Sequence, residues 1–156
     1  MAQYQEHLSV GMHDGTIIEG KALLYNKSRL SELFNDDTAR FIVLDDATDD
    51  AGRKKERVYI NKDRIIWAAP RDVMHSSQNP LGGATEYVEV LIKIIKNVII
   101  QGRINLQVFD NIFDMLRYTG TAPFLVLINA RDTNGELHHT LFVNKSSIMQ
   151  IESGAL

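Results

Sequence analysis

Cysteine is absent from this chain of 156 residues, which excludes disulfide bonds, thiolate zinc sites and catalysis by a thiol. Long apolar runs are also missing, because the longest candidate, Val88–Ile100, is interrupted by four polar residues, and we do not expect a membrane span. The first ten residues lack the basic start and the apolar run of a signal peptide. We therefore expect a cytoplasmic protein that does not associate with a membrane.

A basic region of the kind that attracts nucleic acid is not evident either. Residues 1–78 carry 11 Lys+Arg against 13 Asp+Glu, residues 79–156 carry 6 against 7, and the net charge is −3. Neither half therefore has the excess of positive charge that attracts a phosphate backbone at long range, although these counts do not exclude a local basic patch. What the chain does have is 44% apolar and 24% charged residues, the balance of a globular protein that buries a core.

An internal repeat is the strongest signal in the sequence. Shifting the chain along itself by 82 or 83 positions aligns twelve identical residues in the same order. The aligned pairs are Ile17 with Ile99, Ile18 with Ile100, Gly20 with Gly102, Phe41 with Phe124, Val43 with Val126, Leu44 with Leu127, Ala47 with Ala130, Asp49 with Asp132, Gly52 with Gly135, Asn61 with Asn144, Lys62 with Lys145 and Ile65 with Ile148. We interpret this as a duplication, with domains at residues 1–72 and 87–156 and a linker of small polar residues at 73–86.

Both copies begin with the same signals of secondary structure. An alternating apolar pattern predicts a first, half-buried strand. The second strand of each copy contains a shared glycine, Gly20 or Gly102, which indicates a bend, a bulge or a close backbone approach. Apolar residues spaced i, i+3 and i+4 then predict a helix of two turns, for which Ser28 and Asp110 are the expected N-caps.

Three further strands follow the helix in each copy. Asn134-Gly135 predicts a two-residue type I′ turn between two of them, because that turn needs positive φ at both central residues. Each copy is therefore predicted to be β-β-α-β-β-β. Since five short strands in so small a unit would otherwise leave open edges, we predict a mainly β protein made of two small barrels, or of two half-structures paired about a pseudo-twofold axis.

The sequence contains no pattern that we can assign to catalysis or metal binding. The four aspartates between Asp45 and Asp50 lack the spacing of a calcium loop and are interpreted as a solvated hairpin end. The five histidines form no zinc motif, and the adjacent His138 and His139 would point to opposite faces of a strand. Hydrolase, P-loop and dinucleotide motifs are absent. We predict no enzymatic activity, no metal and no cofactor.

The repeated Asn-Lys turn is the candidate binding element. Asn61 and Asn144 suit a tight turn, and the isoleucine that follows is expected to return the chain to the core. Lys62 and Lys145 are expected to keep the turn in water. Because lysine is kept in both copies while neighbouring residues differ, this position carries the one hint of ligand contact.

Aromatic and basic residues near the first turn have two interpretations each. Tyr59 and Phe142 occupy aligned positions, and with Trp67 they could stack on bases, but aromatic residues at alternate strand positions are more often core or interface residues. The basic run from Arg53 to Arg57 could contact phosphates. We favour a charged loop balanced by the acidic run before it, because the second copy lacks the basic residues.

The segments "HDGTIIEGKA", "VYINKDRIIWAAP" and "LFVNKSSIMQIES" resemble the entry and the closing strands of an Sm or LSm domain. This resemblance implies two tandem five-stranded Sm/SH3-like barrels that assemble into rings and hold uridine at the two Asn-Lys turns. The segments "RLSELFND", "FIVLDDA" and "INKDRI" are similar to an uncharacterised bacterial family of small proteins, which implies no activity.

We therefore predict a non-catalytic binding or assembly module of a bacterial cytoplasm. Such a module would associate with itself as a dimer or ring, or with a protein partner. The alternative is an Sm-like protein that binds single-stranded RNA, which the net charge does not favour. The residues predicted to contact the ligand or RNA are Asn61, Lys62, Asn144, Lys145, Tyr59 and Phe142.

Overall fold

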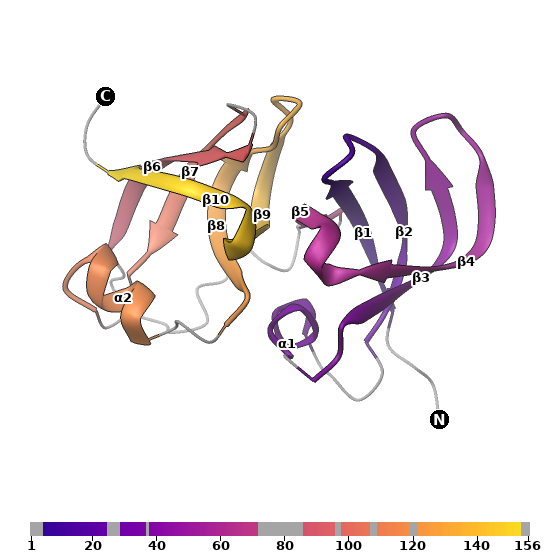
Figure 1. Ribbon diagram of the computed structural model, residues 1–156, viewed down its shortest axis with the longest axis horizontal. Coiled ribbons are helices and arrows are strands. Elements are labelled where there is room, and N and C mark those ends of the chain that lie inside the picture. Colours follow the sequence, from indigo (N-terminus) through magenta and orange to yellow (C-terminus); the bar gives the residue numbers. More distant parts are fainter. Residues whose placement is uncertain are drawn as a thin grey trace. The chain divides into compact units, whose positions relative to one another are not determined.

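The described part of the chain is mainly β, with two short α-helices (Figure 1). The computed structural model describes residues 5–24, 29–36, 38–71, 86–95, 98–106, 109–118 and 122–153. The chain divides into two compact units, Met1–Asp72 and Val73–Leu156. The predicted linker at 73–86 lies, apart from Glu86, outside the described residues. Among those residues, neither helix has the length and apolar character needed to cross a membrane.

The described residues of the first unit form five strands and one α-helix. Its elements are β1 (Gln5–Met12), β2 (Ile17–Leu23), α1 (Leu30–Asn35), β3 (Phe41–Asp49), β4 (Lys54–Asn61), the 3₁₀ helix η1 (Lys62–Arg64) and β5 (Ile65–Pro70). The strands pair antiparallel in the order β5-β1-β2-β3-β4. Alternate residues of the strands lie on one face of this sheet, and they are buried together with apolar residues of α1. The fully buried residues of the unit include Leu8, Val10, Phe34, Ile42, Leu44 and Ile65.

The second unit has the same order of elements. They are β6 (Tyr87–Ile94), β7 (Val98–Asn105), α2 (Ile112–Tyr118), β8 (Phe124–Arg131), β9 (Leu137–Asn144), the 3₁₀ helix η3 (Lys145–Ser147) and β10 (Ile148–Ser153). The strand order within this unit is β10-β6-β7-β8-β9. Its fully buried residues include Ile92, Ile94, Ile100, Leu127, Leu141 and Val143. The prediction of a mainly β protein with one short helix in each half is confirmed.

The helix N-termini differ from the prediction by one residue. α1 begins after Arg29, and Ser28 lies outside the described residues. In α2 the cap is Asn111, whose side-chain oxygen accepts the Asp114 backbone N–H at 2.8 Å. The Asn111 side-chain amide donates to the Asp114 carboxylate at 3.2 Å, which resembles a capping box. The prediction of Asp110 was wrong because asparagine, one residue later, caps equally well.

The hairpin turn at Asn134-Gly135 has three loop residues rather than two. The Asp132 N–H donates to the Glu136 carbonyl at 2.9 Å, and the Gly135 N–H donates to the Asp132 carbonyl at 3.0 Å. Within this loop only Gly135 has positive φ, at 83°, so the type I′ prediction was wrong. The β3–β4 hairpin uses the same loop, with Gly52 at a φ of 80°. Each of the two loops is therefore closed by its own glycine in the left-handed region.

The shared glycines of the second strands face a bulge in the third strands. Asp46 in β3 and Asn129 in β8 have positive φ values of 51° and 49°, and the pairing register shifts beside both. A Cβ on Gly20 would lie 3.1 Å from a backbone carbonyl oxygen of β3, and one on Gly102 would lie 2.7 Å from the Ala130 Cβ. The expected bulge and close approach are therefore both present, and they require glycine.

Candidate functional site

Each Asn-Lys-x-x-Ile segment forms a one-turn 3₁₀ helix between the last two strands of its unit. The Asn61 side-chain oxygen accepts the Asp63 N–H at 2.9 Å, and the Asn144 oxygen accepts the Ser146 N–H at 3.0 Å. In both units the isoleucine donates its N–H back to the lysine carbonyl. Asparagine is thus the N-cap of this turn, and its recurrence is explained by local geometry.

Lys62 is buried, with 5% of its surface exposed. Its Nζ donates to the Leu33 carbonyl at 2.5 Å and to the Asp36 carbonyl at 2.9 Å. These carbonyls lie at the C-terminal end of α1, where helix carbonyls lack intrahelical partners and the helix dipole is negative. The expectation that Lys62 keeps the turn in water was wrong, because the fold places the end of α1 beside the turn.

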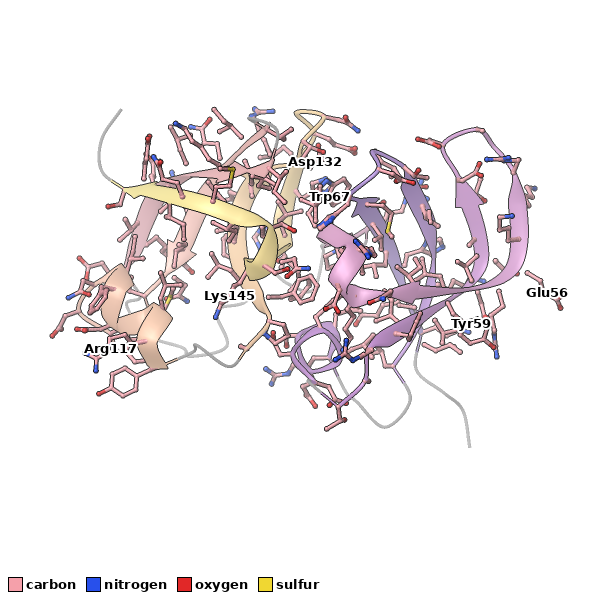
Figure 2. The ribbon with its side chains drawn as sticks, in the orientation of Figure 1. Glu56, Tyr59, Trp67, Arg117, Asp132 and Lys145 are labelled. Atoms are coloured by element: carbon pink, nitrogen blue, oxygen red, sulfur yellow. The ribbon has the colours of Figure 1, made fainter. Side chains whose placement is uncertain are left out.

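Lys145 occupies the corresponding turn of the second unit and is half-buried (Figure 2). Its backbone N–H donates to the Pro123 carbonyl at 2.9 Å, as the Lys62 N–H donates to the Arg40 carbonyl at 2.8 Å. Burial lowers the pKa of the Lys145 ammonium group. The two lysines therefore share a backbone setting but differ in exposure, and their role in ligand contact stays a prediction.

The aromatic candidates differ in exposure. Tyr59 on β4 is 62% exposed, whereas Phe142 on β9 is 4% exposed and Trp67 on β5 is 2% exposed. The Trp67 indole lies against Gly11 of β1, where a Cβ would come within 2.3 Å of the ring. Trp67 and Phe142 are therefore packing residues, and the expectation that Phe142 offers a stacking surface was wrong. Tyr59 alone of the three presents its ring to solvent.

The basic run of the first unit is partly neutralised by the acidic run before it. Arg57 donates twice to the Asp45 carboxylate, at 2.6 and 3.0 Å, and Arg53 pairs with Asp49 at 2.9 Å. The hydrogen bond from Arg57 is the main cause that lowers the pKa of Asp45. This agrees with the interpretation of a balanced, charged hairpin.

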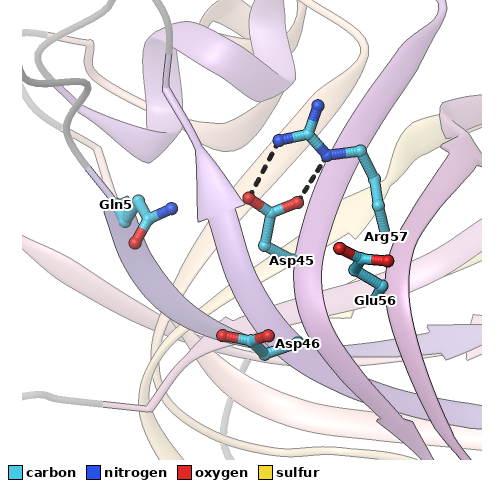
Figure 3. Close-up of a pocket in the computed structure, with 5 residues that line it drawn as sticks. All are labelled: Gln5, Asp45, Asp46, Glu56 and Arg57. Atoms are coloured by element: carbon cyan, nitrogen blue, oxygen red, sulfur yellow. Dashed lines mark hydrogen bonds and ion pairs between the residues drawn. The ribbon is translucent and has the colours of Figure 1, made fainter.

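A polar hollow of about 560 Å³ opens beside the Asp45–Arg57 pair (Figure 3). Its lining residues are Gln5, Asp45, Asp46, Glu56 and Arg57. Three carboxylates against one guanidinium suit a cationic or amide-bearing group rather than an anion or an apolar molecule. The Arg57 guanidinium is already held by Asp45, so it is not available as an anion-binding group.

An Asp–Glu–His group at the β8–β9 hairpin brings together three residues that could bind a metal. Donor atoms of Asp132, Glu136 and His138 all lie within 4.8 Å of one another. One Asp132 oxygen accepts the backbone N–H groups of Asn134 and Glu136 at 2.8 and 3.1 Å, and the other lies 2.7 Å from His138 Nε2. Burial acts to raise the pKa of Asp132, but these hydrogen bonds outweigh burial and lower it. In the first unit Asp49 accepts the two corresponding backbone N–H groups, from Ala51 and Arg53. The geometry of the hairpin therefore accounts for an aspartate at this position in both units.

The α2 helix presents aromatic rings to solvent that sequence patterning did not single out. Phe113 is 68% exposed and Tyr118 is 75% exposed. The Arg117 guanidinium carbon lies 5.7 Å from the centroid of the Phe113 ring, and the Tyr118 ring stacks on Phe109 with centroids 5.3 Å apart. The spacing of Phe113 and Arg117, away from the buried Met115, is the signal that could have revealed this surface.

No family model, curated protein or solved structure matches this chain. The resemblance to Sm and LSm domains therefore stays a prediction. Two of the described surfaces are not explained by packing or by hairpin geometry. One is the β4 strand with its lysines and Tyr59, and the other is the outward face of α2.

Proposed function

We propose that this protein is a non-catalytic binding module whose β4 strand binds an extended, acidic segment of another protein. The proposed scaffold is two tandem five-stranded barrels of the Sm/SH3 type. In both units the first strand lies between the second and the last, which supports this scaffold. The observation that carries the proposal is the exposed position of β4 at the end of the strand order.

An edge strand offers a row of backbone N–H and C=O groups to a further strand. Within the described residues β4 pairs with β3 and with no second strand. Extended segments add to such an edge through main-chain hydrogen bonds, and alternate side chains then select the partner. Lys55, Arg57 and Tyr59 share one face of β4 because alternate residues of a strand point the same way.

At the start of β4 two exposed lysines, Lys54 and Lys55, outnumber one exposed glutamate, Glu56, and this excess favours an acidic partner. Arg57 is already paired with Asp45, whereas Lys54 and Lys55 are exposed and have no ion pair among the described residues. Their ammonium groups can pair across the strands with carboxylates of an added segment. Tyr59 would cover an apolar side chain of the same segment.

The titratable groups of the hairpins support a role without catalysis. The pKa values of Asp45, Asp49 and Asp132 are all lowered by hydrogen bonds made within their own hairpins. A carboxylate whose ionised form is stabilised in this way is a poor general base at neutral pH. The hydrogen bonds of the hairpins therefore account for the lowered pKa values of these three carboxylates.

Single-stranded RNA is the second candidate ligand, because the exposed Tyr59 and the exposed Lys55 share one face of β4, which also suits base stacking and phosphate contact. Two observations favour the peptide. The Lys62 ammonium is occupied by helix carbonyls, and Phe142 is buried, so neither can contact RNA at an Asn-Lys turn.

The proposal is tested by fluorescence anisotropy with four labelled probes. These are a short peptide of alternating glutamate and valine, the same peptide with lysine for glutamate, the glutamate peptide with N-methyl groups on alternate backbone nitrogens, and oligouridine. We expect the glutamate peptide to bind, the lysine peptide not to bind, and the N-methylated peptide to lose about tenfold or more because it cannot donate to β4.

Variants of the protein locate the site. Lys54→Glu with Lys55→Glu should abolish binding of the glutamate peptide, and Tyr59→Ala should weaken it about tenfold. Tyr118→Ala removes a ring of α2 that is somewhat more exposed than Tyr59, and as the matched control it should leave binding unchanged. Equal binding of the N-methylated and unmodified peptides would contradict strand addition. If oligouridine were the one probe that bound, the ligand would be RNA and not an acidic peptide.

A further inference from the structure

The outward face of α2 consists of Phe113, Asp114, Arg117 and Tyr118. Phe113 and Arg117 are four residues apart, as are Asp114 and Tyr118, so the four positions lie within an arc of about 140° on one side of the helix. The opposite side is the packed one, since Met115 is 5% exposed while the two aromatic residues are 68% and 75% exposed. Because both rings are exposed to water, they are not required for packing of this seven-residue helix.

The side chains of this face are held in place within their own unit. Arg117 lies over the Phe113 ring at 5.7 Å, and the Tyr118 ring stacks on Phe109 at an interplanar angle of 17°. Aromatic and arginine side chains dominate the free energy of protein interfaces, and side chains that are already ordered lose less entropy on binding. The α2 face therefore has the composition of an interface.

The first unit builds the same helix without such a face. With the repeat offset of 82, the residues of the first unit that align with Phe113, Asp114, Arg117 and Tyr118 are Ser31, Glu32 and Asn35 of α1 and Asp36, which follows it. Only the acid at the second position is kept. The same succession of strands and helix is thus formed with a polar outward face, so the aromatic residues of α2 serve something other than the fold of the unit.

We propose that two copies of this chain associate through the α2 face, with their α2 helices antiparallel about a two-fold axis. An axis that passes level with the middle of the helix, between Met115 and Leu116, places Phe113 opposite Tyr118 of the second copy. The same axis places Asp114 opposite Arg117 of the second copy. By symmetry each contact occurs twice, so the face is complementary to itself in both its rings and its charges.

The charge pattern selects this occupant. A nucleic acid or an anionic lipid surface would bring phosphates against Asp110 and Asp114 as well as against Arg117. A basic partner would satisfy the acids and repel the arginine. An antiparallel copy of α2 presents the acid and the arginine in reverse order, and so it satisfies both.

The area of the contact implies weak association. One short helix from each copy buries much less than the roughly 1,600 Å² of a standard stable interface, which places this contact among the transient ones. We expect a dissociation constant of about 0.1–1 mM for the isolated protein. The association would therefore respond to local concentration, for example when several copies bind one partner.

Sedimentation velocity of the full chain between about 10 µM and 1 mM tests the proposal. The sedimentation coefficient should rise toward that of a dimer with concentration. Arg117→Glu and Asp114→Arg should each weaken the dimer about tenfold or more, because each places like charges opposite one another twice. An equimolar mixture of these two variants should restore association, since every opposed pair in the mixed dimer then has opposite charges.

Controls separate this contact from other causes. Tyr59→Ala, which removes an exposed ring from β4, should leave the sedimentation profile unchanged. Phe113→Ser combined with Tyr118→Asp copies the α1 residues and should leave a folded monomer by circular dichroism. If Asp114→Arg unfolds the helix by losing the Asn111 contact, this combined variant and Arg117→Glu decide the question. A monomer at 1 mM, association that Arg117→Glu leaves unchanged, or a mixture of folded variants that fails to associate would overturn the proposal.

Discussion

Replacement of Lys62 by methionine tests whether the repeated lysine has a structural role. Methionine keeps most of the volume and the apolar stem of lysine, but it removes the ammonium group that donates to the Leu33 and Asp36 carbonyls. The C-terminal end of α1 then loses its hydrogen-bond donor and its compensating charge at once. Because Lys62 is 5% exposed, water has little access to take the place of the ammonium group.

The size of the effect follows from these contacts. A hydrogen bond to a charged group contributes about 1.5–3 kcal/mol, so two such bonds give about 3–6 kcal/mol before compensation. Burial of the methionine side chain returns about 1.5–3 kcal/mol. We therefore expect Lys62→Met to lower the free energy of unfolding by about 1.5–3 kcal/mol. For a chain of this length that corresponds to a fall in melting temperature of about 3–12 °C.

Urea and thermal unfolding followed by circular dichroism measure this loss. Lys54→Met, on the exposed part of β4, is the matched control and should change stability by less than about 0.5 kcal/mol. Lys145→Met, at the half-buried turn of the second unit, should have a smaller effect than Lys62→Met. The reasoning is refuted if Lys62→Met is as stable as the wild type. If that stable variant also lost binding of a peptide or RNA probe, Lys62 would be a ligand contact instead.

Two further variants test the bulge and the hairpin. Gly102→Ala should destabilise the protein by about 1–3 kcal/mol in urea unfolding, because the new Cβ would lie 2.7 Å from the Ala130 Cβ. Adding Ala130→Gly to the same chain should recover part of this loss of stability. If it recovers none, the strain does not come from the contact with Ala130. Asp132→Asn should be less stable than the wild type at pH 7. The folded pKa of Asp132 lies below its ordinary value of 3.8, so its ionised form stabilises the fold above that pH and the contribution is lost as the pH falls through the folded pKa. The stability gap between Asp132→Asn and the wild type should therefore narrow below about pH 4, and a gap independent of pH would contradict the assignment.

Local patterns were enough to predict the order of strands and helices. Alternation and the i, i+3, i+4 spacing depend on a residue and its near neighbours, so they can be read before the fold is known. Errors arose where two neighbouring residues could serve one role. Asn111 rather than Asp110 caps α2, and Gly135 alone supplies the positive φ that was assigned to Asn134 as well.

The candidate site was less predictable than the elements that carry it. Aligned residues such as Tyr59 and Phe142 have opposite exposures, at 62% and 4%, although both precede the same turn. The α2 face was missed because the apolar stripe of Ile112, Met115 and Leu116 was enough to predict the helix, and the residues outside that stripe were not considered. Exposure depends on which surfaces meet, and the neighbours that cover a side chain are distant in the sequence.

The sequence by itself determined the two sets of β-β-α-β-β-β elements, the glycines at the bulge and the asparagine caps of the Asn-Lys turns. These follow from backbone conformation and from contacts between residues a few positions apart. Only the tertiary structure decided that the Lys62 ammonium leaves the water for the carbonyls of α1, and that Lys145 remains half-buried. The physical reason is that a charged side chain goes wherever it gains enough hydrogen bonds to offset its desolvation, and the carbonyls that provide them at Lys62 come from residues 26 and 29 positions away.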